Sequence, residues 1–216
     1  MDKTKLIHII KELKEKSKKR NFIQNFDLVI NFKGIDLKKE ANRLNSFVLL
    51  PFSKGKPIKI CALTDKNSLK EAKSLFDKAL LKEDLDGISK KEAKKLSQDY
   101  DYFVCHASLM ASLATSIGKF LASKGKMPNP KYGCIYNNPE QLPGLKIKLN
   151  KLAKTIMKKE ATIKAIVGLD SAKDEEIAEN ILTIYNHVIN EVPQGKTKIR
   201  SVLLKLTMGE PKKIEP

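Results

Sequence analysis

Near the start of the chain, hydrophobic residues recur with the spacing of an α-helix among many lysines, which predicts an amphipathic helix at residues 3–18. Its apolar face consists of Leu6, Ile9, Ile10 and Leu13. The pattern then changes to strict alternation in FDLVINF, residues 26–32, which predicts a strand with one buried face. A further strand is predicted at 46–51, where Pro51 ends it because proline cannot donate to a sheet.

The middle of the chain alternates between strand-like and helix-like segments. We predict strands at 58–63 and 102–105, and helices at 68–81, 90–97 and 108–121. This order is typical of a parallel sheet covered by helices.

The last part of the chain predicts a strand, a helix and a final strand. The strands are expected at 162–168 and 199–208. Ser171 and Asp174 have the spacing of a capping box at the start of the helix. The apolar stripe of this helix consists of Ile177, Ile181, Tyr185 and Val188.

Neither end of the chain supplies a large core of its own. We therefore predict an α/β protein of two domains, the first of them discontinuous. An α+β domain would combine residues 1–53 and 154–216 in a split β-α-β pattern, around an inserted Rossmann-like α/β domain at 54–153.

The charge is strongly positive, with 42 Lys and Arg against 25 Asp and Glu and a formal net charge of +17. Such a field attracts polyanions, of which nucleic acid is the first candidate. The sequence shows neither a long apolar run nor a signal peptide, so we expect a soluble, cytoplasmic protein that does not bind membranes. Nearly all the cations are lysines, and the arginines are Arg20, Arg43 and Arg200.

Motifs for catalysis, metals and cofactors are weak. Cys61, Cys105 and Cys134 are widely spaced, which argues against a disulfide framework or a zinc finger and favours buried, reduced thiols. The loop around Gly125 differs from a phosphate-binding P-loop, because six residues separate it from Gly118 and a methionine follows Lys126. We expect no enzyme activity, no metal and no cofactor.

Three segments combine cations with groups suited to RNA. The first holds Arg20, Asn21 and Phe22. The second holds Arg200, Ser201, Lys205, Thr207, Met208 and Gly209. The third is a glycine- and proline-rich loop with Lys119, Lys124, Lys126 and Lys131. Two alternatives stay open: an enzyme that handles phosphate or a nucleotide with the loop at 123–133, and a general basic protein that binds any nucleic acid.

These segments together resemble the large-subunit ribosomal proteins of the L-one family, in its archaeal and eukaryotic-like branch. RNFIQNF, GIDLKK, NR, LP, GKMPNPKYG and LTMG occur in family order over nearly the whole chain. The resemblance implies the two-domain fold given above and a structural role at the mobile stalk beside the ribosomal exit site. The implied partners are large-subunit ribosomal RNA, transfer RNA whose release it assists, and its own messenger RNA, which it represses; the free protein would be a monomer.

The resemblance also implies a role for individual residues. Phe22, with Arg20 and Asn21, would face RNA beside Ser201, Thr207, Met208 and Gly209. Thr207 would bond to sugar or backbone, Met208 would pack on ribose or base, and Gly209 would admit the RNA. The lysine loop would add contacts.

The chain departs from the family pattern at three places. Ala122 and Ser123 replace a Gly-Pro pair before KMP, and Glu210 separates Gly209 from Pro211. The usual LPHG near the first hinge is LPFS.

Overall fold

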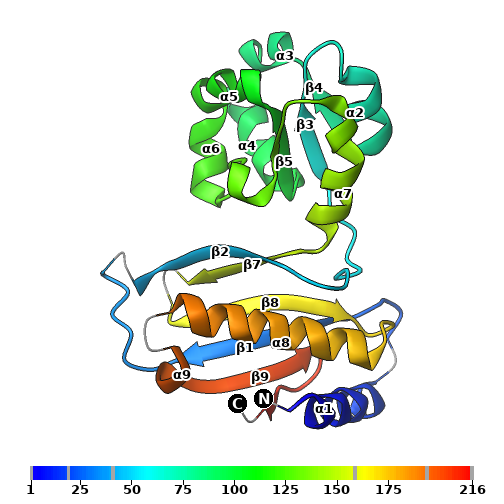
Figure 1. Ribbon diagram of the computed structural model, residues 1–216, viewed down its shortest axis with the longest axis vertical. Coiled ribbons are helices and arrows are strands. Elements are labelled where there is room, and N and C mark those ends of the chain that lie inside the picture. The colour runs from blue at the N-terminus through cyan, green and yellow to red at the C-terminus, as the bar shows by residue number, and fades with distance from the viewer. Residues whose placement is uncertain (1, 19, 40–41, 158–159, 193–194, 215–216) are drawn as a thin grey trace. The chain divides into compact units, whose positions relative to one another are not determined.

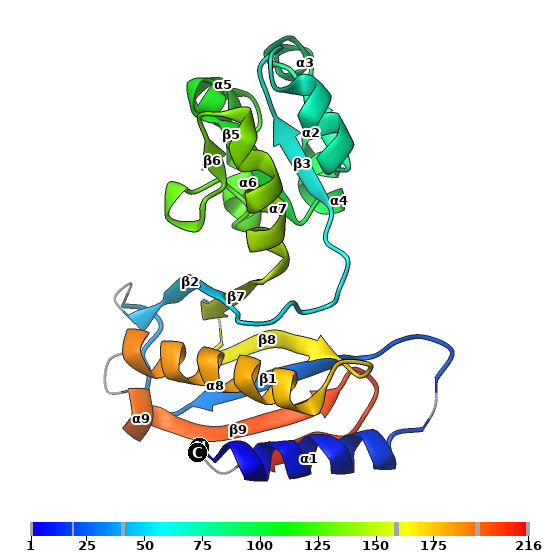
Figure 2. The same cartoon turned by 45° about the vertical axis from the view of Figure 1, so that its right-hand side comes forward.

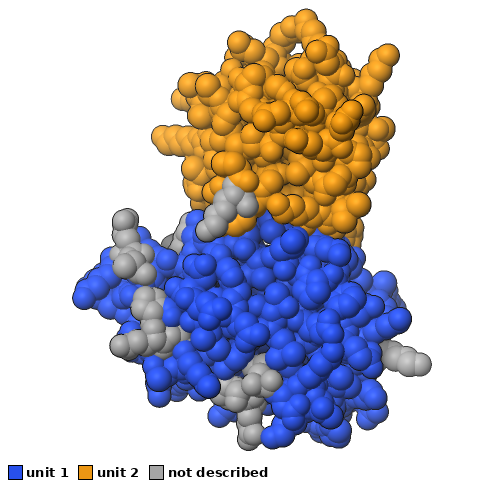
Figure 3. All heavy atoms as spheres, viewed as in Figure 1, with its two compact units in different colours: residues 1–56, 151–216 blue, residues 57–150 orange. Residues whose placement is uncertain are grey.

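The computed structural model describes residues 2–18, 20–39, 42–157, 160–192 and 195–214. Its internal contacts divide the chain into two compact units, which Figure 3 colours separately. Unit 1 comprises Met1–Lys56 and Lys151–Pro216, and unit 2 comprises Pro57–Asn150. The candidate site is built mainly from unit 1.

Unit 1 contains a four-stranded antiparallel sheet of order β10-β9-β1-β8 (Figure 1). Strand β1 (Asn25–Phe32) lies between β8 (Thr162–Leu169) and β9 (Ile199–Leu206), and the short β10 (Lys212–Ile214) pairs with β9. A central strand from the start of the chain therefore depends on partners from its end.

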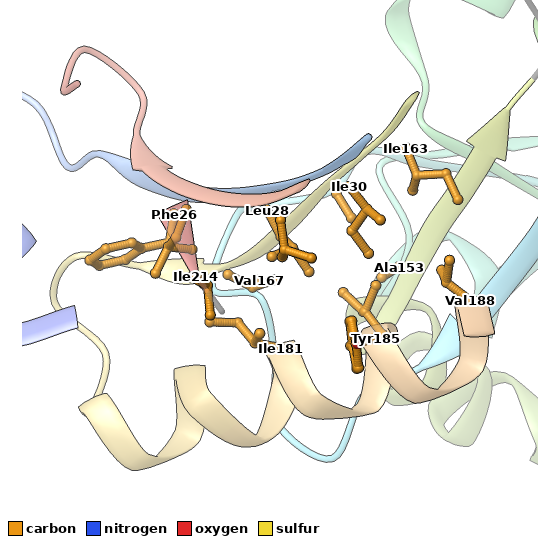
Figure 4. Close-up of a cluster of buried hydrophobic side chains, with 14 of the residues drawn as sticks. Phe26, Leu28, Ile30, Ala153, Ile163, Val167, Ile181, Tyr185, Val188 and Ile214 are labelled. Atoms are coloured by element: carbon orange, nitrogen blue, oxygen red, sulfur yellow. The ribbon is translucent and has the colours of Figure 1, made fainter. Parts of the chain in front are cut away.

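Two helices cover one face of this sheet, α1 (Lys3–Lys16) and α8 (Asp174–Glu191). Alternate residues of β1 are buried, as its sequence predicts, and they pack against the apolar stripe of α8 (Figure 4). The predicted stripe residues are all buried: Ile177, Ile181, Tyr185 and Val188. The opposite face of the sheet carries the remaining, partly exposed side chains of the same strands.

A second pair of strands in unit 1 connects it to the inserted segment. Strand β2 (Leu44–Leu49) pairs antiparallel with β7 (Leu152–Met157). Beyond the pair, the Leu50 N–H donates to the Lys151 carbonyl at 2.9 Å. The chain therefore leaves unit 1 and returns to it at neighbouring positions. The short helix α9 (Gly195–Lys198) directly precedes β9.

Unit 2 has a parallel sheet of order β4-β3-β5-β6 with helices beside it (Figure 2). Its strands are β3 (Ile60–Leu63), β4 (Lys78–Leu80), β5 (Tyr102–His106) and β6 (Ile135–Tyr136). Its α-helices are α2 (Leu69–Leu75), α3 (Lys82–Asp86), α4 (Lys90–Asp99), α5 (Met110–Ser116), α6 (Gly118–Lys124) and α7 (Leu142–Asn150). The predicted α/β class is confirmed, with an antiparallel sheet in one unit and a parallel sheet in the other.

Two predicted helices in the middle of the chain were wrong in extent. The helix expected at 68–81 ends at Leu75, and residues 78–80 form β4 beside β3. Asp77 helps to end it, because its carboxylate accepts from the Ile60 N–H at 2.8 Å and holds the chain at the sheet. The helix expected at 108–121 is divided into α5 and α6 at Ile117, which leaves the helical conformation with ψ near −1°.

The capping prediction for α8 was also wrong. Lys173 occupies the N-cap, without a side-chain cap, and the helix begins at Asp174. Asp174 instead forms an ion pair with Lys14 of α1 at 2.6 Å. The Asp174 carboxylate therefore links α8 to α1. It also lies in the first turn of α8, where the helix dipole favours an anion.

Candidate nucleic-acid interface

Strand β1 and the end of β9 hold the Thr207 segment in place. The Thr207 N–H donates to the Asn25 carbonyl at 3.0 Å. The Thr207 hydroxyl accepts from the Asn25 N–H at 3.1 Å and donates to the same carbonyl at 3.3 Å. A hydroxyl has one proton and two lone pairs, so one acceptor position is left for a ligand. Two segments 182 positions apart in the sequence thus form one surface.

Residues 207–209 form a turn rather than the end of a strand. Strand β9 ends at Leu206, and the Gly209 N–H donates to the Leu206 carbonyl at 2.9 Å. The Met208 N–H donates to the side-chain oxygen of Gln24 at 3.1 Å. The final strand predicted at 199–208 is therefore two residues too long, and Met208 is presented by a closed turn.

Exposed hydrophobic side chains occur on residues 22–23 and on the turn at 207–209. Among the described residues, the large hydrophobics that are exposed are Phe22, Ile23, Leu49, Ile147 and Met208. Phe22 is 52% exposed and Met208 is 61% exposed. Arg20 and Asn21 are also exposed. We call the segments 20–22 and 207–209 together the motif end of unit 1; it combines apolar surface with hydrogen-bonding groups, which suits contact with unpaired bases and ribose.

A hollow of about 500 Å³ lies at the motif end. Its lining includes Lys16, Lys18, Arg20, Met208, Gly209 and Lys212. Glu12 at its edge forms ion pairs with Lys16, at 2.7 Å, and with Lys212. Hydrogen bonds from Lys16 and then Lys212 lower the pKa of the Glu12 carboxyl to about 2. Glu210 also lines the hollow, so four cations face two carboxylates and a modest positive balance remains to attract phosphates.

The open face, which we define as the outward side chains of β1, β8 and β9, carries a polar row across three strands. The Thr162 hydroxyl donates to the Asn31 side-chain oxygen at 3.0 Å. The Asn31 amide nitrogen donates to the Ser201 hydroxyl at 3.0 Å. Since its oxygen accepts from Asn31, the Ser201 hydroxyl keeps its proton for a ligand. Ser201 and the exposed Arg200 lie at the start of β9, roughly 20 Å along an extended strand from Thr207.

Lys205 lies between these two ends of β9. It is directly opposite Asp27 in the register of β1 and β9. Partial burial raises the pKa of the Asp27 carboxyl, while the charges of Lys205 and Lys56 oppose that change. Ser201, Lys205 and the motif end thus lie along the open face, whereas Arg200 has the parity of the buried residues of β9 and is not part of this row.

The predicted lysine loop belongs to unit 2, but only Lys126 and Lys131 lie in the segment after α6, because Lys119 and Lys124 are part of that helix. Lys119 and Lys124 are exposed, whereas Lys126 is partly buried and donates to the Tyr100 carbonyl at 2.6 Å. Burial lowers the pKa of the Lys126 ammonium. The side chain of Lys131 lies outside the described part of the structure. Lys126 therefore also ties the loop to the end of α4.

The geometry of this loop disfavours the phosphate-handling enzyme. Gly125 has a left-handed conformation, with φ of 63°, and ends α6. The loop thus follows the carboxyl end of a helix, where the helix dipole is negative, whereas phosphate loops precede a helix N-terminus. A phosphate bound here would lack the favourable dipole.

The cysteines are free and buried, as predicted. Burial raises the pKa of the Cys61 and Cys105 thiols to about 12 and also raises that of Cys134, so all three are poor nucleophiles near neutral pH. Within the described ranges, no group of three or more His, Cys, Asp or Glu is placed to hold a metal ion. Nor does any helix in those ranges have the length and apolar character needed to cross a membrane.

Sequence reasoning missed several residues that support the interface: Gln24, Asn25, Asp27, Asn31, Thr162 and Asp170. Alternation in 26–32 does place Asp27 and Asn31 on the outward side of β1. Their partners depend on the register between distant strands, for which the local sequence offers no signal.

Comparison of the sequence with known proteins shows the family of this chain. A model of the ribosomal protein L1p/L10e family matches residues 13–210. The chain belongs to this family. The resemblance seen in its motifs is thereby confirmed, and the matched residues include every predicted RNA contact.

Among its relatives are archaeal proteins named large ribosomal subunit protein uL1. That of Nanoarchaeum equitans is 41% identical over 204 residues, covering 93% of this chain and 94% of the relative. That of Pyrococcus abyssi is 35% identical over 219 residues, covering 99% and 97%. That of Methanothermobacter thermautotrophicus is 33% identical over 210 residues, covering 94% and 95%. All three are named as ribosomal proteins, so the expectation of a protein that is not an enzyme is confirmed.

Proposed function

We propose that the chain is a structural constituent of the large ribosomal subunit and acts on cytoplasmic ribosomes. It binds large-subunit ribosomal RNA at the stalk beside the exit site, through the motif end and the open face of unit 1. Binding requires no cofactor. Membership of the ribosomal family supports this function, and the gathering of the motif residues on one unit supports the surface.

The observation that carries the proposal is the exposure of Phe22 and Met208 beside cations. Leaving two large apolar side chains in water is unfavourable unless a partner covers them. RNA supplies such a partner, because bases and riboses offer flat apolar surfaces next to phosphates. The remaining lone pair of Thr207 and the hydroxyl proton of Ser201 would then meet groups of the RNA backbone.

The test is equilibrium binding to a folded ribosomal RNA fragment that spans the stalk, and to an unrelated hairpin of equal length, over a series of salt concentrations. A purely electrostatic protein treats both RNAs alike and loses about 0.7–0.9 log units of affinity per log unit of salt for each phosphate contacted. We expect preference for the stalk fragment that persists at high salt. Equal, salt-sensitive binding would instead support the general basic protein.

Single variants test the surface itself. Phe22→Ala should weaken binding to the stalk fragment by about 1–3 kcal/mol, as the loss of base–aromatic stacking does. Met208→Ala should weaken it as well, because the apolar packing of its thioether is lost. Leu49→Ala is the matched control, because Leu49 is 51% exposed on β2 of the same unit but lies outside the motif end. If Phe22→Ala and Met208→Ala both kept the wild-type affinity, the RNA would have to bind outside the motif end.

We further propose that the ribosome-bound protein assists the release of deacylated transfer RNA, with the lysine loop adding contacts to RNA. Charge supports such a role for both units: unit 1 has 26 Lys and Arg against 15 acids, and unit 2 has 16 Lys against 10. Neutralising Lys119 and Lys124 together should slow release of deacylated transfer RNA from ribosomes that carry the variant. An unchanged release rate would argue against the loop.

We also propose that the protein represses its own messenger RNA. The family resemblance supports this proposal. Repression would use the same surface of unit 1 that we propose for ribosomal RNA, so the two RNAs would bind one site. The messenger should then compete with the stalk fragment for the same protein, and Met208→Ala should weaken both interactions together. Binding of both RNAs at once would contradict it.

A further inference from the structure

Gln24 lies under the motif end but is itself hidden from solvent. Its exposure is 3%, which is unusual for a glutamine in a connecting segment. The side-chain oxygen accepts from the Met208 N–H at 3.1 Å, and the amide nitrogen donates to the Ser17 hydroxyl at 3.0 Å. One buried amide therefore joins the segment after α1 to the turn at 207–209.

The main chain of Gln24 is fixed as well. Its N–H donates to the Asp170 carboxylate at 3.3 Å, and its carbonyl accepts from the Asp170 N–H at 2.9 Å. The side chain is thus attached to a backbone held by the loop that follows β8. Its oxygen has little freedom to leave Met208.

The contact with Met208 fixes a part of the turn that the sheet does not reach. Pairing with β1 holds Thr207 through Asn25, but Met208 lies beyond the end of β9. Its N–H points inward to Gln24, while its side chain is 61% exposed. The direction in which Met208 presents its side chain therefore depends on this amide.

We propose that Gln24 is a positioning residue for RNA binding, which orders the turn at 207–209 before RNA arrives and does not itself touch RNA. The inference rests on the proposed function, since it concerns the same surface. A preordered turn loses less entropy when it docks, so removal of the amide should weaken specific binding. Binding that depends on charge alone should not change.

Gln24→Met tests this, because methionine has a similar length and volume but lacks both the acceptor and the donor. We expect affinity for the stalk fragment to fall about fivefold to tenfold, with affinity for the unrelated hairpin unchanged. Hydrogen exchange of the Met208 amide in the free protein should accelerate. Ser17→Ala removes the other partner of Gln24 and should change the affinity less than about twofold, because the bond to Met208 remains.

A control for stability separates positioning from general damage. Val188→Ala creates a cavity in α8, where Val188 is fully buried, and should destabilise unit 1 without altering the preference for the stalk fragment. If Gln24→Met keeps the wild-type preference, Gln24 is not a positioning residue. If the wild-type protein itself shows no preference, the proposed function fails, and this inference fails with it.

Discussion

At the scale of single residues, Asn31 shows how one side chain can set the hydrogen-bonding chemistry of another, here the Ser201 hydroxyl for which we propose an RNA contact. Its amide lies between two hydroxyls, donating to Ser201 and accepting from Thr162. The donated proton occupies a lone pair of Ser201 and leaves the serine proton for a ligand. The interface is therefore polarised toward acceptors such as phosphate and ribose oxygens.

Asn31→Asp should reverse this polarity. An aspartate accepts from both hydroxyls, so the Ser201 proton turns inward and a negative charge enters the open face. A hydrogen bond to a charged group contributes about 1.5–3 kcal/mol, so we expect affinity for the stalk fragment to fall at least about tenfold in equilibrium binding. Thr162→Val, which removes the far end of the row, should have a smaller effect; equal losses in both variants would contradict the assigned direction.

The two ends of the binding surface differ in how far their residues could be predicted. Phe22, Met208 and the arginines were recognisable because aromatic, flexible apolar and guanidinium groups stand out in a chain dominated by lysine. Gln24 and Asn31 were not, since an amide gains its role from partners 184 and 170 positions away. The sequence thus indicates the side chains that would contact a ligand. It does not indicate the side chains that position those contacts.

At the scale of elements, α1 and β10 are joined by charges rather than by a sheet. Glu12 of α1 pairs with Lys16 on its own helix and with Lys212 of β10. This ionic contact helps to fix the edge strand that follows the turn at 207–209. The position of the edge strand β10 therefore depends on the ionisation of the Glu12 carboxylate.

The Glu12 contact predicts a dependence of stability on pH. The pKa of its carboxyl is about 2 in the folded protein against 4.5 for an ordinary glutamate, so its contribution is present above pH 4.5 and is lost as pH falls toward 2. In urea unfolding, Glu12→Gln should be slightly less stable than the wild type at pH 6, and the difference should vanish by about pH 2. Glu15→Gln, an exposed acid on the same helix, is the control; a pH-independent difference for Glu12→Gln would refute the ionic origin.

Elements were predictable from the sequence where periodicity extended over many residues. Strand β1 and helix α8 were found because alternation continues over residues 26–32 and the helical stripe over residues 177–188. Strands β4 and β10 have three residues each and were missed, since so short a segment shows no period and is made a strand by its neighbours. The apolar residues of β4 were consequently assigned to the preceding helix.

At the scale of the whole molecule, unit 1 is continuous in space although it is interrupted in sequence. The pair β2–β7 brings Leu50 and Lys151 into hydrogen-bonding contact. A segment that leaves and returns at neighbouring points can be replaced with little strain on the rest. The residues that make up the motif end all belong to the part that would remain.

Replacing residues 57–150 by a short flexible linker should therefore leave a folded unit 1. We expect a cooperative unfolding transition by circular dichroism, and affinity for the stalk fragment within about tenfold of the full chain, the difference being the lost electrostatic contacts of unit 2. An unfolded product would show that unit 1 needs the insert. A folded product without preference for the stalk would place the specific contacts in unit 2.

The position of β1 between β8 and β9 also determines when, during synthesis, the protein can begin to act. Residues 57–150 contain every strand of their own sheet and can fold as soon as they emerge from the ribosome that makes them. Strand β1 is made early, but both of its neighbours come from residues beyond 160. The turn that presents Met208 needs Gln24 as well as residues 206–209, which are made more than 180 positions later. A growing chain thus carries a complete insert before it can form the proposed RNA surface, and we expect affinity for the stalk fragment only after residues 199–209 have been made.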